Sequence, residues 1–400
     1  MAPLRVLMPF LGTELGGSHV SALMLAGHLP GVGVEPVIAL HRTDGPLAGY
    51  LEEIGLPFVA APPFAMKPPR GADAPRALGS LLAALPRLRS WLRKGAFDIV
   101  HTNDGRMHAA WGLASCGMPV CQLWHHRGDP WARGANWLAP FTAHRIVSVS
   151  EFARPARPVL PLARRTEVIH SPFAHPGAPD RAAARARLAS EIGCPADALI
   201  LGYFGLLIAR KRPQMMADIV RAVSSRTPRP VHAVLFGDTG AGSLAVEVEA
   251  RAAELGVADR VHLAGHRRPV EPWMSGVDAL VVPALGEPFG RTLIEAMLLG
   301  TPVVATRHGG NVEAIADGRT GHLVDPDDPA AFVGPLLRLR DDAGHRNTIT
   351  ETARREAGAH FGIAQHVSRI AAIYRELAAE HRWAATKGDG PMLRTVEAAE

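Results

Sequence analysis

Short apolar runs alternate with segments of helical periodicity over residues 5–170, and the alternation restarts at residue 199. This pattern predicts repeated βα units and parallel sheets, because neighbouring parallel strands need a helical crossover between them. Helices are expected at 20–28, 77–94, 213–223 and 244–255. Strands are expected at 5–10, 34–40, 99–101, 120–124, 145–149 and 168–170, and then at 199–204, 231–236, 261–264, 279–282 and 303–306.

A Pro-, Ala- and Gly-rich region at 171–180 interrupts the pattern, and 400 residues exceed one ordinary domain of about 150. We therefore expect two doubly wound α/β domains, over 1–172 and 173–360, with a linker near 171–198. A C-terminal helix is expected at about 361–385, where it can pack back on the first domain. Ligands of such sheets lie outside the carboxyl ends of the strands, so the site is expected in a cleft between two facing domains.

The composition excludes several classes of protein. With 47% hydrophobic residues, 40 Gly and 34 Pro, the chain is neither disordered nor collagen-like. Three cysteines fit a reduced, cytoplasmic setting better than a disulfide scaffold. No apolar run approaches the roughly 20 residues of a membrane span, so we expect a soluble protein, at most peripheral at the inner face of the membrane. A net charge of +5 suggests an anionic partner.

The segment 285–304 carries the strongest functional signal. A strand is expected just before it, followed by a loop with Gly and Pro and then a helix. Backbone N–H groups at such a helix start lack helical partners and form a site for an anion, in particular a diphosphate. The groups expected to do so belong to Phe289, Gly290, Arg291 and Thr292.

Two glutamates flank this expected anion site. Glu287 lies in the loop, and Glu295 lies on the second turn of the helix. Two acceptor carboxylates suit a ligand with hydroxyl groups on both sides of its phosphates, and a nucleotide sugar is such a ligand. The alternative is an ordinary exposed glutamate in a loop and another on a helix.

The same segment resembles the Glu-x7-Glu signature of retaining glycosyltransferases of the GT-B fold, in particular the large family 4. The resemblance implies that Glu287 contacts hydroxyls of the donor sugar and that Glu295 binds the ribose. It is strong over 199–335 and weak before residue 199. With matching spacing, it continues through residues 300–306, 309–313, 317–318 and 321–324.

A second match runs from Gly205 to Lys211, where the family pattern is Gly-Arg-Leu-x-x-x-Lys. The resemblance implies that Lys211 neutralises the diphosphate leaving group. Leu206 replaces the family Arg, and the loss of a cation beside a departing phosphate should cost rate. Arg210 is a candidate to supply the missing charge. The alternative is that Arg210, Lys211 and Arg212 form a solvated basic loop.

A glycine pair follows the first expected strand. Gly16 and Gly17 let the backbone approach a ligand, and Ser18 is expected to cap the next helix. The pair resembles the Gly-Gly loop that the family places near the donor phosphates and the acceptor. Gly16 and Gly17 are therefore candidate donor-binding residues, although a tight turn explains them equally well.

His125 follows an expected strand at the spacing of the family's Pro-x5-His element. The resemblance implies that this histidine lies in the cleft and helps to position the donor sugar, with His126 as a competitor. A lone histidine is more often structural, but the strand-end placement favours a functional role here. Asn103 replaces the second His of the family's Asp-x-x-His-x-His element, which indicates strand-end architecture near the acceptor side.

Other ligands find little support in the sequence. His125, His126 and Asp129 are potential metal ligands, but their spacing matches no closed zinc pattern. We expect no metal and no cofactor, as the resemblance also implies. Residues 237–242 read Gly-x-x-Gly-x-Gly, which is not the order of a dinucleotide loop.

Residues 76–94 have leucines at helical spacing and basic residues toward the C-terminal end. The favoured interpretation is a helix that packs on a core, with a basic end that complements the helix dipole. The alternative is a peripheral contact with anionic lipid.

These features predict a retaining glycosyltransferase with an acceptor-side N-terminal domain and a nucleotide-sugar-binding C-terminal domain, both Rossmann-like. It would transfer a hexosyl group from a UDP- or GDP-sugar to a hydroxyl of a saccharide, a lipid-linked saccharide or a small molecule, in polysaccharide or glycoconjugate biosynthesis. Glu287, His125 and Lys211 are the expected catalytic residues, and no nucleic-acid partner is expected. Two alternatives stay open: an epimerase or hydrolase of the same fold, and a non-catalytic nucleotide-sugar-binding partner.

Overall fold

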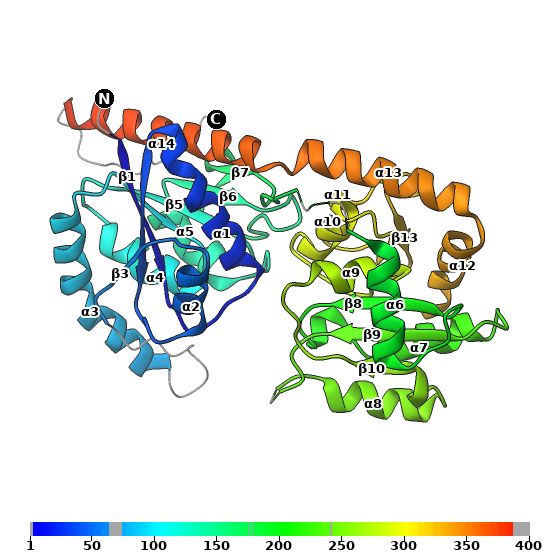
Figure 1. Cartoon of the computed structure of the whole chain (residues 1–400). Helices are drawn as coiled ribbons and strands as arrows, with labels where there is room; N and C mark the ends of the chain where they lie inside the picture. Colours follow the sequence, from blue (N-terminus) through cyan, green and yellow to red (C-terminus); the bar gives the residue numbers. More distant parts are fainter. Residues whose placement is uncertain (1–2, 64–73, 176, 178, 241, 387–400) are drawn as a thin grey trace, which may run out of the picture. The chain divides into compact units, whose positions relative to one another are not determined.

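The computed structural model describes residues 3–63, 74–175, 177, 179–240 and 242–386, with the side chains of 74–78 and 382–386 excepted. The chain folds into two compact units (Figure 1). Unit 1 contains the chain up to Pro172 together with the segment from Ile363 onward, and unit 2 contains Phe173–Gly362.

Unit 1 is built on a seven-stranded parallel sheet with the order β3-β2-β1-β4-β5-β6-β7. The sequence order reverses between β1 and β4, and the carboxyl ends of the strands at such a switch point form the ligand crevice of doubly wound sheets. The strands are β1 (Leu4–Phe10), β2 (Val34–Leu40), β3 (Phe58–Ala60), β4 (Ile99–Thr102), β5 (Cys121–His126), β6 (Arg145–Ser148) and β7 (Thr166–Val168).

Two apolar cores cover the two faces of this sheet. Met8 and Phe10 of β1 belong to the core with α1, α2 and α14, whereas Leu7 belongs to the core with α3 and α4. This alternation follows from the two-residue period of a strand. The helices are α1 (Gly17–His28), α2 (Pro46–Glu53), α3 (Ala74–Gly95), α4 (Gly105–Ser115), α5 (Ala139–Thr142) and α14 (Ile363–Thr386), with short 3-10 or π segments at Leu29–Val32, Gly134–Leu138 and Ala163–Arg165.

The C-terminal helix α14 packs into unit 1 (Figure 1). Val367, Ile370, Ile373 and Tyr374 recur at spacings of three and four residues and are buried in the core that also contains α1. Tyr374 is fully buried, so this helix carries a hydroxyl group into the centre of the unit.

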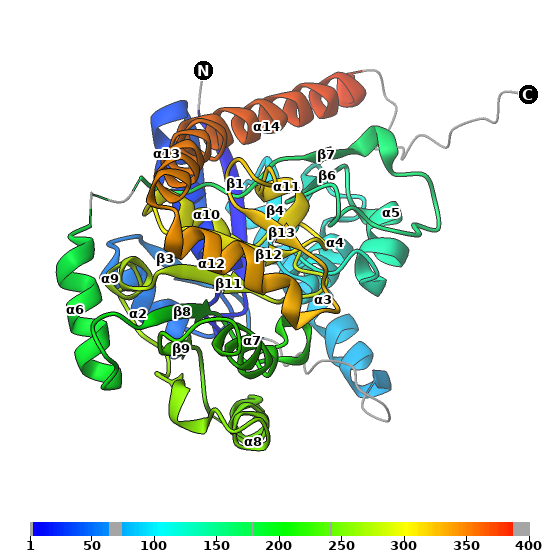
Figure 2. The same cartoon turned by 90° about the vertical axis from the view of Figure 1, so that its right-hand side faces the viewer.

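Unit 2 has a six-stranded parallel sheet with the order β10-β9-β8-β11-β12-β13 and a switch point between β8 and β11. The strands are β8 (Leu199–Phe204), β9 (Val231–Phe236), β10 (Val261–Leu263), β11 (Ala279–Val282), β12 (Val303–Thr306) and β13 (His322–Val324). The helices, seen in a second view in Figure 2, are α6 (Arg181–Ile192), α7 (Met215–Ser224), α8 (Ala245–Glu254), α9 (Glu271–Gly276), α10 (Arg291–Leu298), α11 (Asn311–Ala314), α12 (Val333–Asp341) and α13 (Ala343–His360). Short 3-10 segments lie at Ala209–Lys211, Ala258–Arg260 and Pro329–Phe332.

Several elements differ from the sequence predictions. The strands β3 and β13, of three residues each, were not expected. The strand β7 ends at Val168, where the predicted strand began. The helix α6 occupies most of the second half of the expected linker, and its N-terminal cap is Asp180, whose side chain accepts the N–H of Ala183 at 3.0 Å.

The expected cap of α1 is also different. The helix begins at Gly17, so Ser18 lies inside it, and Gly16 is the cap residue. The N–H of Gly16 donates to Nδ1 of His19 at 3.1 Å, which satisfies a donor at this helix start.

Three leucines of α3 favour its interpretation as a core helix, whereas Leu82 is 52% exposed. Leu81, Leu88 and Leu92 are buried in the core of unit 1, and Arg89 donates to the carbonyls of Ala114 and Cys116. These side chains are therefore unavailable to lipid, whereas Arg76 and Leu78 fall outside the side chains that the structure describes. Within the described residues, no helix combines the length and apolar character needed to cross a bilayer.

Candidate functional site

The switch point of unit 2 brings two loops together. One loop follows β8 and contains Lys211, and the other follows β11 and contains Glu287. The N–H of Leu285 in the second loop donates to the carbonyl of Arg210 in the first at 2.8 Å. Two of the three predicted catalytic residues, Glu287 and Lys211, therefore meet at the carboxyl ends of the central strands, where doubly wound sheets bind ligands.

Glu287 is a largely buried carboxylate, with 12% of its side chain exposed. Its Oε2 accepts from Nη1 of Arg210 at 2.6 Å and lies 3.4 Å from Nζ of Lys211. Burial alone would raise the pKa of Glu287, but the charges and hydrogen bonds of Lys211 and Arg210 outweigh burial and hold this pKa below its ordinary value. Glu287 is therefore an ionised acceptor, and hydroxyl groups are suitable donors to it.

A glycine turn after β12 fixes the backbone of the Glu287 loop. The N–H of Gly310 donates to the carbonyl of Glu287 at 2.7 Å. A Cβ atom on Gly310 would lie 2.4 Å from the carbonyl oxygen of Pro288, and one on Gly309, which has a φ of +59°, would lie 2.8 Å from that of Glu287. The Gly-Gly pair of the signature thus permits a backbone approach that a side chain would prevent.

The basic residues after β8 face different partners. Leu206, at the position of the family Arg, is 56% exposed and brings no charge. Arg210 places a guanidinium on the same carboxylate oxygen as Lys211, so a second cation is present. Arg212 instead donates to the carbonyl of Pro326 at 2.6 Å. The three consecutive basic residues therefore do not form one solvated patch.

The helix α10 begins at Arg291, immediately after Gly290, whose φ of +76° lies in the left-handed region. Arg291 pairs with Glu295 at 3.0 Å, so the two polar groups of the first turns are held together. The side chain of Phe289 is buried, and only its backbone can face a ligand. Thr292 is half-buried in the first turn. The anion site at this helix start stays a prediction.

Gly16 and Gly17 lie exposed at the start of α1, on the side of the unit 1 sheet where β1 ends. Gly16 has a φ of −148°, which any residue adopts, and Gly17 has no positive φ. No atom lies closer than 3.9 Å to a Cβ atom built on Gly16. The tight-turn explanation of this glycine pair therefore has no support in the backbone.

His125, on β5, lies in a row of buried rings in unit 1. Its ring stacks against His101 of β4 and His366 of α14, with centroids 5.3 and 5.8 Å away. His126, the next residue of the strand, points to the other face, where its Nε2 contacts the carbonyl of Asp129 at 3.1 Å. The two candidate histidines thus have separate surroundings.

Hydrogen bonds select the tautomer of His125. Arg127, which can only donate, donates from Nη2 to Nδ1 of His125 at 3.2 Å, so this nitrogen carries no proton. The Nε2 of His101 lies 3.2 Å from the same nitrogen and therefore donates. Nδ1 of His101 is left to accept from the hydroxyl of Tyr374 at 2.5 Å. In its neutral form, His125 consequently has its proton on Nε2.

Three hydrogen-bonding atoms of this network have no partner among the described residues, namely Nε2 of His125, Nε2 of His366 and Nδ2 of Asn103. Asn103 is oriented by Arg127, whose Nε donates to Oδ1 at 3.2 Å. Burial, followed by the charge of Arg127, lowers the pKa of His125 far below its ordinary value, so the ring is neutral at pH 7. His125 and Asn103 are therefore neutral donors, suited to an uncharged oxygen such as a sugar hydroxyl.

His125, His126 and Asp129 lie close in sequence but do not form a common metal site. The two histidines point to opposite faces of β5, so the three side chains do not converge. Within the described part of the chain, no group of three or more His, Cys, Asp or Glu residues is arranged to hold a metal ion.

Three members of the histidine network were missed in the sequence. Arg127 lies two residues after His125, and this strand-like spacing was an available signal. Tyr374 and His366 come from α14, and 273 residues separate Tyr374 from its partner His101. No local pattern relates positions that far apart.

Comparison with known proteins identifies the family. The model described as Glycosyltransferase Family 4 matches residues 15–172, and the model described as Glycosyl transferases group 1 matches residues 198–342. A D-inositol 3-phosphate glycosyltransferase of Streptomyces scabiei is 31% identical over 406 residues, which cover 92% of this chain and 88% of that protein. One of Thermobispora bispora is 29% identical over 397 residues, with 91% and 90% covered.

Solved structures share the fold. Anabaena HepE in complex with UDP-glucose has a TM-score of 0.77 at 22% identity, and the match covers 93% of this chain and 100% of that one. Sucrose-phosphate synthase from Thermosynechococcus elongatus has a TM-score of 0.73 at 20% identity, with 94% and 100% covered. The predicted GT-B fold with two Rossmann-like domains is confirmed. The chain is a glycosyltransferase, and it belongs to the group 1 and family 4 glycosyltransferases that these two models describe.

Proposed function

We propose that this glycosyltransferase moves a hexosyl group, with retention of configuration, from a nucleotide-diphosphate sugar to an acceptor hydroxyl. The observation that carries the proposal is the convergence of Arg210 and Lys211 on the carboxylate of Glu287. This group lies at the carboxyl ends of the strands that flank the unit 2 switch point, where a ligand is expected. An ionised acceptor beside two cations suits a ligand that joins hydroxyl groups to a diphosphate.

In this mechanism the protein orients the two substrates and stabilises the departing diphosphate. Lys211 and Arg210 neutralise the charge that grows on the diphosphate as the sugar–phosphate bond breaks. Glu287 accepts hydrogen bonds from the donor sugar, and Glu295 accepts from the ribose. The two cations are paired with Glu287, so the diphosphate has to compete with this carboxylate for them when it binds.

Unit 1 supplies neutral groups for the reacting sugar. The proton on Nε2 of His125 and the amide of Asn103 are both available to donate to uncharged oxygens. A neutral imidazole can orient a hydroxyl group without a desolvated charge beside the reacting carbon. Gly16 and Gly17 are exposed near the end of β1. In this proposal side chains and backbone carry out the reaction without a metal ion or a cofactor.

The comparisons direct the choice of substrates. HepE was solved with UDP-glucose, which makes a UDP-sugar the first donor to test, ahead of a GDP-sugar. The relatives are named for D-inositol 3-phosphate, so a polyol phosphate is the first small-molecule acceptor. Saccharides and lipid-linked saccharides are the other acceptor classes.

The test is nucleotide release from UDP-, GDP- and ADP-sugars with and without each acceptor. Release that depends on the acceptor supports transfer, whereas release without acceptor supports the hydrolase or epimerase alternative. The anomeric configuration of the product, read by NMR, tests retention.

The matched variants are Glu287→Ala and Glu191→Ala. Glu287→Ala should abolish transfer and leave nucleotide binding largely intact. Glu191 is also ion-paired in unit 2, with Arg267 at 3.0 Å, so Glu191→Ala controls for the loss of a paired carboxylate. Transfer by Glu287→Ala at the wild-type rate would show that the site is wrongly placed.

A further inference from the structure

Unit 2 contains a pocket of about 450 Å³ at the edge of its sheet opposite to Glu287. Leu199 and Ala279, the first residues of β8 and β11, line this pocket, whereas Glu287 follows the carboxyl end of β11. The lining includes five arginines from α6, α12, α13 and the loop before β9, which are Arg181, Arg185, Arg229, Arg340 and Arg346.

The lining of this pocket has an excess of positive charge. Only two carboxylates, Asp197 and Asp278, line it beside the five guanidinium groups. A guanidinium keeps its charge in proteins, so neighbouring arginines cannot relieve their repulsion by losing a proton. The excess therefore favours an anion in the pocket.

Asp278 is shared among several of these cations. Its Oδ2 accepts the N–H of Ile200 at 2.7 Å and lies 3.4 Å from Nη2 of Arg185. Burial raises the pKa of Asp278, and the charges of Arg185, Arg181 and Arg346 oppose that effect. One carboxylate thus faces three guanidinium groups and cannot neutralise all of them.

Some guanidinium N–H groups of this pocket have no hydrogen-bond acceptor in the described protein. Among the described residues, the guanidinium of Arg229 has no hydrogen bond or ion pair, and Nη1 of Arg185 is buried without a partner. Arg346 donates from Nη1 to the carbonyls of Leu339 and Arg340, and no carboxylate of the described segments lies within ion-pair distance of it. Arg340, in contrast, is held by both oxygens of Asp341.

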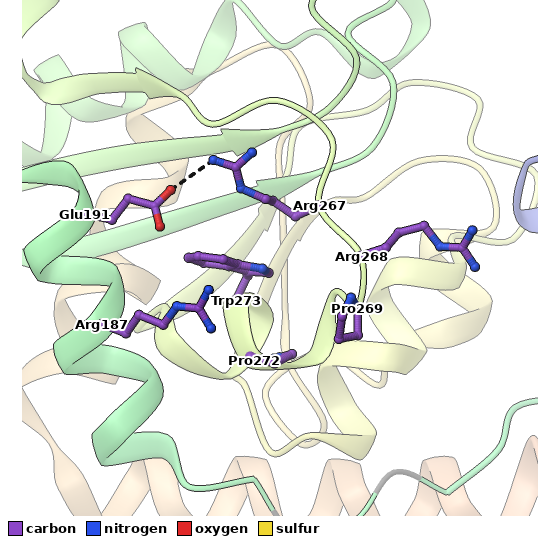
Figure 3. A pocket seen from close by; sticks show the side chains of 7 residues that line it. All are labelled: Arg187, Glu191, Arg267, Arg268, Pro269, Pro272 and Trp273. Carbon is purple, nitrogen blue, oxygen red and sulfur yellow. Dashed lines mark hydrogen bonds and ion pairs between the residues drawn. The ribbon is translucent and has the colours of Figure 1, made fainter.

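A neighbouring pocket of about 380 Å³ shows the opposite situation (Figure 3). Its Arg267 pairs with Glu191 at 3.0 Å, and the guanidinium of Arg187 lies 4.3 Å from the centroid of the Trp273 ring. Two of the three arginines that line this second pocket, Arg187 and Arg267, are therefore already engaged. Arg187 also lies on α6, which makes it a control for charge removal from the same helix.

We propose that the five-arginine pocket binds the phosphate group of a small phosphorylated molecule, at a site separate from Glu287. The planar fork of a guanidinium matches two phosphate oxygens, and the unused donors of Arg185 and Arg229 are available for such bonds. Arginines from four chain segments would share one anion, so binding links α6, α12 and α13. The proposal does not depend on the donor or acceptor of the transfer reaction.

Inorganic phosphate is the probe, titrated into the full chain at constant ionic strength against chloride, with affinity read by calorimetry. Wild type should bind phosphate above the chloride background. Arg229→Gln should weaken binding about tenfold, because one charge-assisted bond is lost. Its fold should be unaffected, since the guanidinium makes no direct hydrogen bond in the described protein and only its charge acts on Asp341. Arg346→Gln should weaken binding similarly.

Two control variants decide where the phosphate binds. Arg187→Gln removes the same charge from the adjacent pocket and should retain the wild-type affinity. Lys211→Gln removes a cation from the Glu287 site and should also retain it. The proposal is overturned if phosphate does not bind above chloride, if Arg229→Gln binds as wild type, or if either control loses affinity equally.

Discussion

Arg210 donates from Nη1 to Oε2 of Glu287 over 2.6 Å, and Nζ of Lys211 lies 3.4 Å from the same oxygen. Two consecutive cations from the loop after β8 thus converge on one largely buried carboxylate from the loop after β11. Removal of one partner from such a cluster leaves a charge without full compensation, which is costly in a buried site. Residues of this cluster should therefore affect both the geometry of the site and its chemistry.

The first prediction concerns the replacement of the family Arg by Leu206. Arg210→Gln should lower kcat/KM about tenfold to a hundredfold if Arg210 supplies the missing charge to the departing diphosphate. Adding Leu206→Arg to that variant should restore part of the rate, because position 206 is exposed and can accept a long side chain. Steady-state kinetics with the donor panel measures both effects.

Arg212→Gln is the control for this series, because its guanidinium bonds to the carbonyl of Pro326 and not to Glu287. It should keep kcat/KM within about threefold of wild type. If Arg210→Gln and Arg212→Gln behave alike, Arg210 does not compensate for Leu206.

The second prediction is that Tyr374 positions His125 through His101. Tyr374→Phe removes the hydroxyl that donates to Nδ1 of His101 and leaves a buried acceptor unsatisfied, at a cost of about 1–3 kcal/mol. His101 can then take the other tautomer, in which its Nε2 no longer donates to Nδ1 of His125, so that Arg127 alone still orients the His125 ring. We expect kcat to fall about tenfold with little change in the donor KM. In ¹⁵N NMR spectra the imidazole tautomers of His101 should become mixed, whereas His125 should keep its proton on Nε2 through Arg127.

Ile373→Val is the matched control, because it removes one methylene from the same buried face of α14 at a cost of about 1 kcal/mol. It should leave the tautomers unchanged. Equal losses of activity in the two variants, without a change in the NMR signals of Tyr374→Phe, would reduce Tyr374 to a packing residue.

The third prediction concerns the glycine turn behind Glu287. In Gly310→Ala the new Cβ atom would lie 2.4 Å from the carbonyl oxygen of Pro288, so the loop must shift. A displacement of about 1 Å in a positioning loop costs roughly a hundredfold in rate. A Cβ atom on Gly334, in α12, would have no neighbouring atom within 4 Å, so Gly334→Ala should retain activity. Activity and Tm of both variants are compared, and full activity in Gly310→Ala would contradict the close contact.

The fourth prediction is a loss of stability in acid. Burial lowers the pKa of His366 to about 3, and that of His41 and of His144 to about 4, from an ordinary 6.5. Below about pH 6.5 the unfolded chain binds protons that the folded chain excludes, so the free energy of unfolding falls as the pH falls. The slope is about 1.4 kcal/mol per pH unit for each such histidine.

Urea unfolding between about pH 7.5 and pH 5 measures this slope. Above about pH 6.5 these histidines are neutral in both states, and their contribution should no longer change with pH. His366→Gln should reduce the acid slope by the share of one histidine. A free energy of unfolding that stays constant over this range would contradict the burial of these rings.

Much of the fold could be predicted from the sequence, because both faces of the parallel sheets are covered and their strands become continuous apolar runs. The six residues of β8 and of β9 are all buried, and both strands were expected at their observed bounds. The strands β3 and β13, with three residues each, were not recognised in the sequence, whereas β10 of the same length was. Their existence depends on the neighbouring strands β2 and β12.

The candidate site, like the fold, could be predicted from the sequence only in part. Glu287 and Lys211 could be placed together from the sequence, because each follows a strand of one parallel sheet and carboxyl ends share an edge. The sequence alone left open whether Arg210 faces this site or solvent. The hydrogen bond between Leu285 and Arg210 and the burial of Glu287 decide this question, and both arise from packing between the loops.

The alternation of apolar runs, read from the sequence by itself, determined two Rossmann-like domains and the loops that carry the expected diphosphate chemistry. It could do so because strand and helix periods are local properties of the chain. Only the tertiary structure decided which ring nitrogen of His125 carries the proton. That choice passes through Arg127, His101 and Tyr374, and the last of these comes from a helix 273 residues away from its partner. A hydrogen bond between residues so far apart cannot be predicted from local periodicity, because it forms only when α14 packs against the sheet of unit 1.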